Sequence, residues 1–251
     1  FGTSGRTYNN SKTLIQSYGA DFREISIKDA CIQHFKDIHH KDGVFDITYE
    51  NTQARERTQI LFDVANQEGG IVVGTGDLSE LALGWATYNG DHMSNYGINC
   101  SIPKTLVTTL IRHIKDSEEG IIKKTLEDIL ATPISPELLP LDENGNIKQE
   151  TEKNVGPYIL NDFFLYHFLR YGAPMKKIYF LALNTFKDEF TKEEIKATLI
   201  LFVKRFFTQQ FKRNCVPDGI KVGSVAVSPR GDLRMSSDTH YKLYLDEVEK
   251  L

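Results

Sequence analysis

The segment GGIVVGTGDLSELALG at 69–84 limits the possible folds more than any other part of the chain. Its apolar run at 69–76 is bounded by glycines, which is typical of a buried parallel strand. A helix start follows directly, because Asp77 suits an N-cap position and Glu80 has the spacing of a capping box. A strand that leads through a Thr/Gly turn into a helix is a building block of α/β folds, which bind ligands at the carboxyl ends of their strands.

The rest of the chain is expected to be mainly helical. Apolar spacing predicts helices at 6–18, 28–39, 50–66, 104–116, 120–130, 157–170, 174–185, 191–211 and 239–249. REISI at 23–27 is a candidate for a second strand, whereas the polar segment 141–154 and the Pro/Gly-containing segment 212–238 predict irregular structure. We therefore expect an α/β fold, with a parallel sheet flanked by helices and a mostly helical C-terminal extension. The expected domains are a ligand-binding core at 1–140 and a helical part with a substrate-covering loop at 141–251.

Composition excludes several classes of protein. The chain has 251 residues, 40% of them hydrophobic, and a net charge of -4, which argues against a nucleic-acid-binding module. No apolar run reaches the roughly 18 residues of a membrane span. The three cysteines form no CxxC pair, so neither a disulfide framework nor a structural zinc site is expected. A reducing, cytoplasmic location is the default for such a chain.

Several polar residues have both a functional and a structural interpretation. Asn51 and Arg55 lie one helical turn apart and either bind a phosphate or carboxylate or form a solvated helix face. Glu80 is either a ligand of a divalent cation or a capping carboxylate. Lys104 either contacts phosphate or is a surface lysine, and Ser135 lies between prolines in either a phosphate-binding turn or a rigid connector.

Two further stretches have the composition of ligand-binding loops. GDHMSNYG at 90–97 is rich in glycine and polar residues and almost lacks aliphatic ones. The irregular segment 212–238 carries basic residues that either close over an anionic substrate or are solvated; they are Lys212, Arg213, Arg230 and Arg234.

Taken in order, these stretches resemble the NAD synthetases, and most closely the glutamine-dependent type. The matching strings are GTSGRTYNN, YENTQARERT, GGIVVGTGDLSELALGW, TYNGDHMS, PKTL, TPISPELLP, VGPYILNDFFLYHFLRYG, QFKRNCVPDG and SPRGDLRMSSD. The resemblance spans nearly the whole chain. The strings VGPYILNDFFLYHFLRYG and SPRGDLRMSSD favour the glutamine-dependent branch over the ammonia-dependent one. It implies a fold of the adenine nucleotide α-hydrolase type.

The resemblance also implies a reaction. The nicotinate carboxylate of deamido-NAD attacks the α-phosphate of ATP and releases pyrophosphate. Ammonia from a glutaminase domain then displaces AMP and gives NAD. The implied cofactor is Mg²⁺, with ATP as co-substrate, and the implied assembly is a homo-oligomer.

Site residues follow from the matching motifs, position by position. ATP would be bound by Thr3, Thr75, Lys104 and Ser135. Deamido-NAD would be bound by Asn51, Arg55, Glu80, Trp85, Tyr88, Asp91 and Lys212. Glu80 would also be the Mg²⁺ ligand, and no residue is assigned a covalent catalytic role.

The chain departs from the family pattern in three places. The SGGxDS loop that binds pyrophosphate is absent from the 251 residues, and so is a glutaminase domain with its Glu-Lys-Cys triad. Asn95 stands where the ammonia-dependent enzymes carry Asp. We therefore expect these 251 residues alone not to make NAD. Two alternatives remain open: a catalytically inactive nucleotide-binding or interaction module, and another amidating ligase of the ATP pyrophosphatase type.

Overall fold

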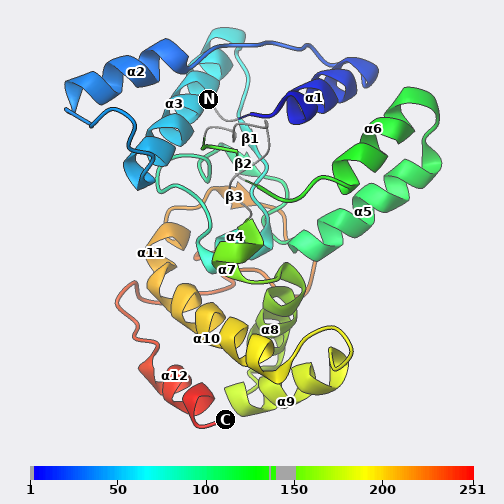
Figure 1. The fold of residues 1–251 in the computed structure, drawn as a ribbon, viewed down its shortest axis with the longest axis vertical. Coiled ribbons are helices and arrows are strands. Elements are labelled where there is room, and N and C mark those ends of the chain that lie inside the picture. The colour runs from blue at the N-terminus through cyan, green and yellow to red at the C-terminus, as the bar shows by residue number, and fades with distance from the viewer. Residues whose placement is uncertain (1–2, 136, 140–150) are drawn as a thin grey trace. The chain divides into compact units, whose positions relative to one another are not determined.

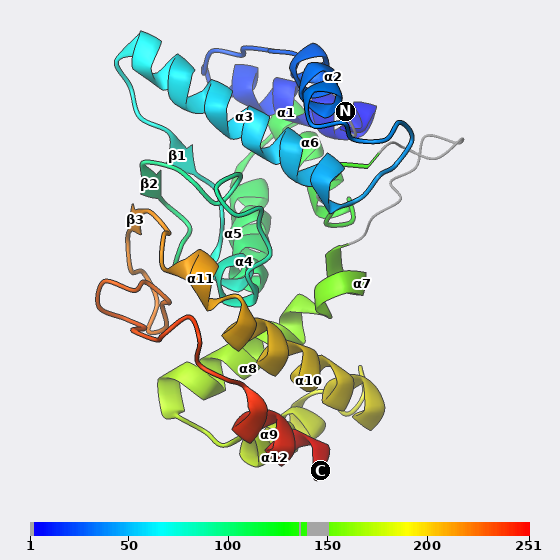
Figure 2. The ribbon, with the colours of Figure 1, turned by 90° about the vertical axis from the view of Figure 1, so that its left-hand side faces the viewer.

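The structure is a computed structural model that describes residues 3–135, 137–139 and 151–251 (Figures 1 and 2). The chain divides into two compact units, each made of two sequence segments. The first comprises Phe1–Leu61 with Leu106–Thr151, and the second comprises Phe62–Thr105 with Glu152–Leu251. The sequence-based division at residue 140 stays a prediction.

The first unit is built from helices. They are α1 (Gly5–Ser17), α2 (Lys28–Asp37), most of α3 (Ile47–Glu68), most of α5 (Lys104–Ser117) and α6 (Gly120–Leu130). Helix α1 packs against α6, and Arg6 forms two hydrogen bonds to the carboxylate of Asp128, at 2.8 and 2.6 Å. The hydroxyl of Ser4 caps α1 by accepting a hydrogen bond from the amide of Thr7.

The second unit contains a small parallel sheet. Its strands β1 (Val73–Gly74), β2 (Tyr96–Gly97) and β3 (Asp218–Gly219) lie in the order β1-β2-β3. The helices of this unit are α4 (Leu78–Leu83), α7 (Thr151–Val155), α8 (Tyr158–Tyr171), α9 (Met175–Thr185), α10 (Lys192–Thr208), α11 (Gln210–Arg213) and α12 (Lys242–Glu249). The parallel pairing confirms the predicted sheet type.

An aromatic core holds the C-terminal helices together. Helix α10 packs against α8, α9 and α12, as both ribbon views show. Phe164 and Phe202 are buried and meet edge to face, with ring centroids 5.8 Å apart. Phe206 stacks on Phe202, and such pairs add about 0.5–1.5 kcal/mol each beyond the burial of their apolar area. The predicted helical extension is therefore confirmed, and α4 packs directly on its helices α8 and α10.

Four local expectations were wrong. Of the segment 141–154, which was predicted to be irregular, Thr151–Asn154 begin helix α7, and 141–150 lie outside the described residues. Residues 23–27 form no strand; Ile25 is exposed, and no described segment pairs with this stretch. The strand predicted at 69–76 contains only Val73–Gly74, and Val73 is exposed, not buried as predicted. Strand β3 was not expected at all inside the irregular segment 212–238.

No helix in the described parts of the chain combines the length and the apolar character that crossing a membrane requires.

Candidate functional site

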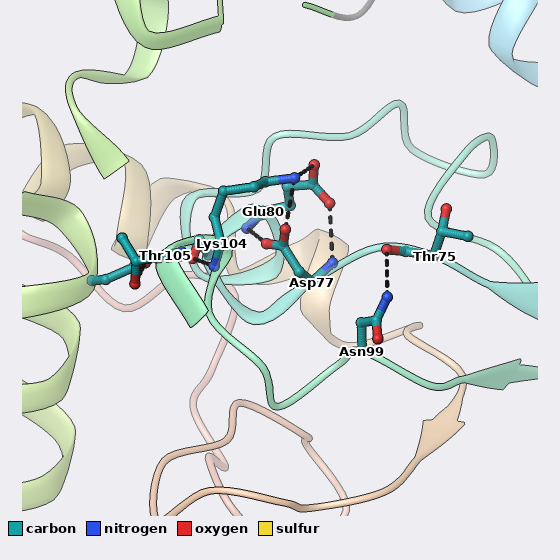
Figure 3. A network of polar contacts seen from close by, with 8 residues as sticks. Thr75, Asp77, Glu80, Asn99, Lys104 and Thr105 are labelled. Atoms are coloured by element: carbon teal, nitrogen blue, oxygen red, sulfur yellow. Dashed lines mark hydrogen bonds and ion pairs between the residues drawn. The ribbon is translucent and has the colours of Figure 1, made fainter. Parts of the chain in front are cut away.

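The turn between β1 and α4 is the centre of the candidate site (Figure 3). A Cβ atom on Gly74 would collide with the side chain of Ser94, so a larger residue here would force Ser94 or the strand to shift. The carbonyl of Thr75 accepts a 3.5 Å hydrogen bond from the amide group of Asn99. The predicted capping box is confirmed: Asp77 accepts from the amide of Glu80, and Glu80 accepts from the amide of Asp77, both at 3.0 Å.

Lys104 joins this capping box from the start of α5. Its ammonium lies 2.7 Å from Oδ2 of Asp77 and 2.8 Å from Oε1 of Glu80. Figure 3 shows the two carboxylates and the ammonium directed at one another. Two residues that the sequence assigned separately, Glu80 and Lys104, therefore belong to one cluster, which also contains Asp77.

The charges in this cluster depend on one another. Burial raises the pKa of Asp77 to about 6, the charge of Glu80 adds to the rise, and Lys104 opposes it. Burial works against the charged form of Lys104, but Glu80 and Asp77 outweigh it and raise the pKa of the ammonium. The cluster therefore combines hard oxygen donors with a protonated lysine at the end of a strand, which suits the binding of a polyanion together with a cation.

Basic side chains gather at the other end of α4. Lys212 donates to the carbonyls of Gly84 (2.8 Å) and Ala86 (2.6 Å). Arg205 donates to the carbonyl of Leu83 at 3.0 Å, and its guanidinium lies 5.3 Å from the ring centroid of Trp85. Burial and the charge of Arg205 lower the pKa of Lys212. Trp85 and Lys212, two of the residues predicted to bind deamido-NAD, thus share one region.

Arg213 is fully buried in the same region. Its guanidinium donates to the carbonyl of Ala82 at 2.6 Å and to the side chain of Gln210 at 2.8 Å, and it also bonds the carbonyl of Phe206. Burial lowers its pKa to about 9. Because the C-terminal end of a helix carries partial negative charge, these cations stabilise α4 and fix the segment that follows it.

The loop after Trp85 packs against α11 and against Cys215, which lies just after that helix. Tyr88 lies against His92 and Phe211, with centroid distances of 5.9 and 5.4 Å. Asp91 accepts a 2.7 Å hydrogen bond from the amide of Thr87. His92 lies 3.3 Å from the sulfur of Cys215, so the loop that carries Tyr88 and Asp91 is anchored to the segment that carries Lys212.

The remaining predicted residues belong to the first unit. Arg55 is exposed and Asn51 half-buried on α3, one turn apart as predicted. Thr3 is exposed just before α1. The hydroxyl of Ser135 accepts a 3.2 Å hydrogen bond from the amide of Glu137.

Glu137 connects that turn to the start of α1. Its Oε1 accepts from the hydroxyls of Ser4 (3.2 Å) and Thr7 (2.6 Å). The residues next to Thr3 and Ser135 are therefore tied together within the first unit, although the two motifs are far apart in the sequence.

Sequence reasoning missed the residues that hold the site in place. Asp162 of α8 accepts hydrogen bonds from Ser79 on α4 and from Thr105, the residue after Lys104. Arg205 and Arg213 donate hydrogen bonds to backbone carbonyls of α4. A signal for Asp162 was present, since it is the one acidic residue in the aromatic string VGPYILNDFFLYHFLRYG. Arg205 gave no such signal, because its backbone acceptors exist at every position of a chain. Arg213 was expected either to close over an anionic substrate or to be solvated, and both expectations were wrong, because it is fully buried and bonds the carbonyl of Ala82.

Comparisons with known proteins point to one family. The sequence model of the family described as NAD synthase matches residues 2–138. The glutamine-dependent NAD(+) synthetase of Mycobacterium leprae is 43% identical over 275 aligned positions, which cover 100% of this chain and 40% of that protein. The protein of the same name from Aquifex aeolicus is 27% identical and matches 76% of this chain and 34% of its own length.

Solved structures show the same fold. A glutamine-dependent NAD(+) synthetase from Cytophaga hutchinsonii superposes with a TM-score of 0.75 at 20% identity, covering 97% of this chain and 38% of that one. An ammonia-dependent NAD synthetase from Campylobacter jejuni gives a TM-score of 0.53 at 17% identity, covering 84% and 70%. The predicted fold of the adenine nucleotide α-hydrolase type is confirmed. The chain spans about 40% of the length of the mycobacterial relatives, and it belongs to the NAD synthase family.

Proposed function

We propose that this chain is the synthetase part of a glutamine-dependent NAD synthetase. It adenylates the nicotinate carboxylate of deamido-NAD with ATP and amidates the product with ammonia derived from glutamine. The observation that carries the proposal is the cluster of Asp77, Glu80 and Lys104 at the end of β1, in a chain of the NAD synthase family. Such a strand end is where α/β folds bind nucleotides.

The reaction has two steps that conserve atoms and charge. A carboxylate oxygen of the nicotinate ring attacks the α-phosphorus, a P–O bond forms, and the bond to pyrophosphate breaks. Ammonia then attacks the carbonyl carbon, AMP leaves with its electron pair, and the nitrogen loses a proton. Both transition states carry concentrated negative charge, so fixed cations and N–H donors accelerate them.

In this proposal Lys104 supplies the fixed cation. Its ammonium is held in place by two carboxylates, so an incoming polyphosphate competes with Asp77 and Glu80 for it. Thr75 lies in the turn that precedes Asp77, and Thr3 and Ser135 are further residues that we propose for ATP binding.

The residues present also fit Mg²⁺. Mg²⁺ takes oxygen ligands and is usually bound by one or two carboxylates together with substrate phosphates and water. Glu80 provides such a carboxylate and keeps 25% of its side chain accessible, whereas the side chain of Asp77 keeps 2%. Glu80 is therefore the residue that would hold the ion, which would neutralise phosphate charge.

Deamido-NAD is assigned to the other proposed residues. Trp85, Tyr88 and Asp91 lie on the segment that follows α4, and Lys212 bonds the backbone of that segment. Asn51 and Arg55 form an amide-bearing, cationic face on α3. The proposal further includes a homo-oligomer in the cytoplasm that receives ammonia from a glutaminase domain.

The test is a coupled assay of both products. The 251-residue chain, and a longer chain that adds an SGGxDS motif and a glutaminase domain, are each supplied with ATP, Mg²⁺, deamido-NAD and either ammonium or glutamine. We expect the longer chain to form NAD and pyrophosphate in equal amounts, and the 251 residues alone to form neither. Pyrophosphate release by the longer chain without deamido-NAD, or NAD formation without ATP, would contradict the proposal.

A further inference from the structure

The carboxylate of Asp162 on α8 binds the start of α5. Its Oδ2 accepts hydrogen bonds from the amide of Thr105 at 3.1 Å and from the hydroxyl of Thr105 at 2.8 Å. Its Oδ1 accepts from the hydroxyl of Ser79 on α4. One side chain of α8 thus connects α4 with the first residues of α5.

Ser79 extends this connection to Lys104. Its hydroxyl oxygen accepts a 2.8 Å hydrogen bond from the backbone amide of Lys104. The first amides of a helix have no partner within the helix. At α5, the amides of Lys104 and Thr105 are satisfied by Ser79 and Asp162, so a distant helix fixes the backbone direction at the residue that carries the ammonium.

Helix α8 also lies next to the ammonium itself. Tyr158 precedes Asp162 by one helical turn, and the Nζ of Lys104 lies 5.7 Å from the centroid of its ring. Tyr158 is 2% exposed, so the residues packed around its ring hold it in place. Helix α8 therefore constrains both the backbone and the charged end of Lys104.

Helix α5 has no capping side chain of its own. A Ser, Thr, Asp or Asn at the preceding position usually caps a helix, but Pro103 and Ile102 precede Lys104 and offer no side-chain acceptor. Burial raises the pKa of Asp162, while its bonds to Ser79 and Thr105 and the charge of Lys104 oppose the rise. A buried carboxylate with three donors is costly unless every donor is held in place, and these donors surround the proposed phosphate-binding residue.

We propose that Asp162 is a positioning residue for ATP binding and acts through Lys104. It holds the turn at 103–105 so that the ammonium stays at the end of β1, in reach of the polyphosphate. This inference rests on the proposed function, because it assumes that Lys104 contacts ATP.

The test is a double-mutant cycle in the full-length enzyme. Asp162→Ala, Lys104→Met and the double variant are compared with the parent for Mg²⁺-ATP affinity by calorimetry, for the KM of ATP and for melting temperature. We expect Asp162→Ala to weaken ATP binding about tenfold when Lys104 is present and less than about twofold in the Lys104→Met background. The melting temperature should fall equally in both backgrounds.

Milder variants keep the test usable if Asp162→Ala fails to fold. Asp162→Asn retains an acceptor for Thr105 and a polar partner for Ser79, and should restore ATP affinity to within about threefold of the parent. Ser79→Ala cuts the link to the amide of Lys104, and should weaken ATP binding only when Lys104 is present.

The outcomes separate this inference from the proposed function. If Lys104→Met leaves ATP affinity unchanged, both are wrong. If Lys104→Met weakens ATP binding while Asp162→Ala and Ser79→Ala do not, the proposed function stands and the positioning role is wrong. An equal loss of affinity in both backgrounds would show that Asp162 acts on the fold and not through Lys104.

Discussion

Lys104 and Glu80 form an ion pair in which Nζ lies 2.8 Å from Oε1, so the proposed phosphate-binding cation and the proposed metal ligand neutralise each other. The same Glu80 closes the capping box of α4 through its other carboxylate oxygen. Capping and binding are therefore compatible roles of one side chain. The same geometry fits both interpretations left open by the sequence, so the effect of a substitution on activity and stability must distinguish them.

Replacing Glu80 with Gln in the full-length enzyme separates those roles. Gln keeps an acceptor for the amide of Asp77 but removes the charge that a metal ion and Lys104 require. We expect turnover to fall on the order of 10²–10³-fold and the Mg²⁺ requirement to rise, since one electrostatic stabiliser of the transition state is lost. Steady-state rates across a Mg²⁺ titration measure both effects.

A matched control exists in α10. Thr191 and Glu194 form a second capping box, in which Glu194 bonds the amide of Thr191 at 2.8 Å. Glu194→Gln should lower the free energy of unfolding by at most about 2 kcal/mol without changing turnover. A folded Glu80→Gln enzyme with normal turnover and normal Mg²⁺ dependence would restrict Glu80 to capping.

Asp77 should make stability depend on pH. Its pKa rises from 3.8 to about 6 on folding, so between these values the folded state binds more protons than the unfolded state. Its contribution to stability is therefore full below about pH 4 and is lost as the pH rises through about 6. Relative to Asp77→Asn, the chain should lose up to about 3 kcal/mol of unfolding free energy across this window.

Urea unfolding at several pH values measures this difference, because titrating groups outside the cluster of Asp77, Glu80 and Lys104 cancel between parent and variant. Asp128 is the control, since its bonds to Arg6 and Asn10 lower the pKa of its carboxylate to about 2. Asp128→Asn should show no comparable loss between pH 4 and 6. A parallel pH profile for parent and Asp77→Asn would contradict the prediction.

Lys212 is predicted to contribute to deamido-NAD binding. Removing its ammonium in Lys212→Met frees the carbonyls of Gly84 and Ala86 and deletes a half-buried positive charge that lies beside the segment carrying Trp85. We expect the KM for deamido-NAD to rise about tenfold or more, because charged hydrogen bonds contribute roughly 1.5–3 kcal/mol, while the KM for ATP stays unchanged.

Lys221→Met is the control, because it removes another lysine of segment 212–238. Lys221 pairs with Asp232 at 2.7 Å and is half exposed. It should alter neither KM. If Lys212→Met lowers only the melting temperature, Lys212 serves to hold the end of α4 and does not recognise the substrate.

Local signals explain what the sequence could predict. The capping box of Asp77 and Glu80 depends on residues three positions apart, and the strand–turn–helix corner follows from it. The extent of β1 and the exposure of Val73 could not be predicted in this way, because they depend on which distant segments pair with this strand and cover its faces. Asp162 was missed for the same reason, since its partners Ser79 and Thr105 lie on other helices.

Strand β3 is the clearest non-local element, and a single glycine tests it. Gly219 pairs with Gly97 of β2, and a Cβ atom at this position would collide with the carbonyl oxygen of Gly97 and the sulfur of Cys100. Gly219→Ala must therefore push the two strands apart. We expect a loss of about 1–3 kcal/mol in the free energy of unfolding, the usual cost of overpacking.

Gly231 provides the matched control, because a Cβ atom there meets no other atom within 4 Å. Gly231→Ala should leave the free energy of unfolding within about 0.5 kcal/mol of the parent. Urea unfolding measures both variants, and hydrogen exchange at the amides of β2 and β3 locates the change. Equal stability of the two variants would mean that segment 212–238 does not pair with β2, since only a paired strand brings Gly219 so close to Gly97. The loss found in Gly219→Ala alone would instead establish that the residues after Lys212 are held by the sheet, which also fixes the position of Lys212 beside α4.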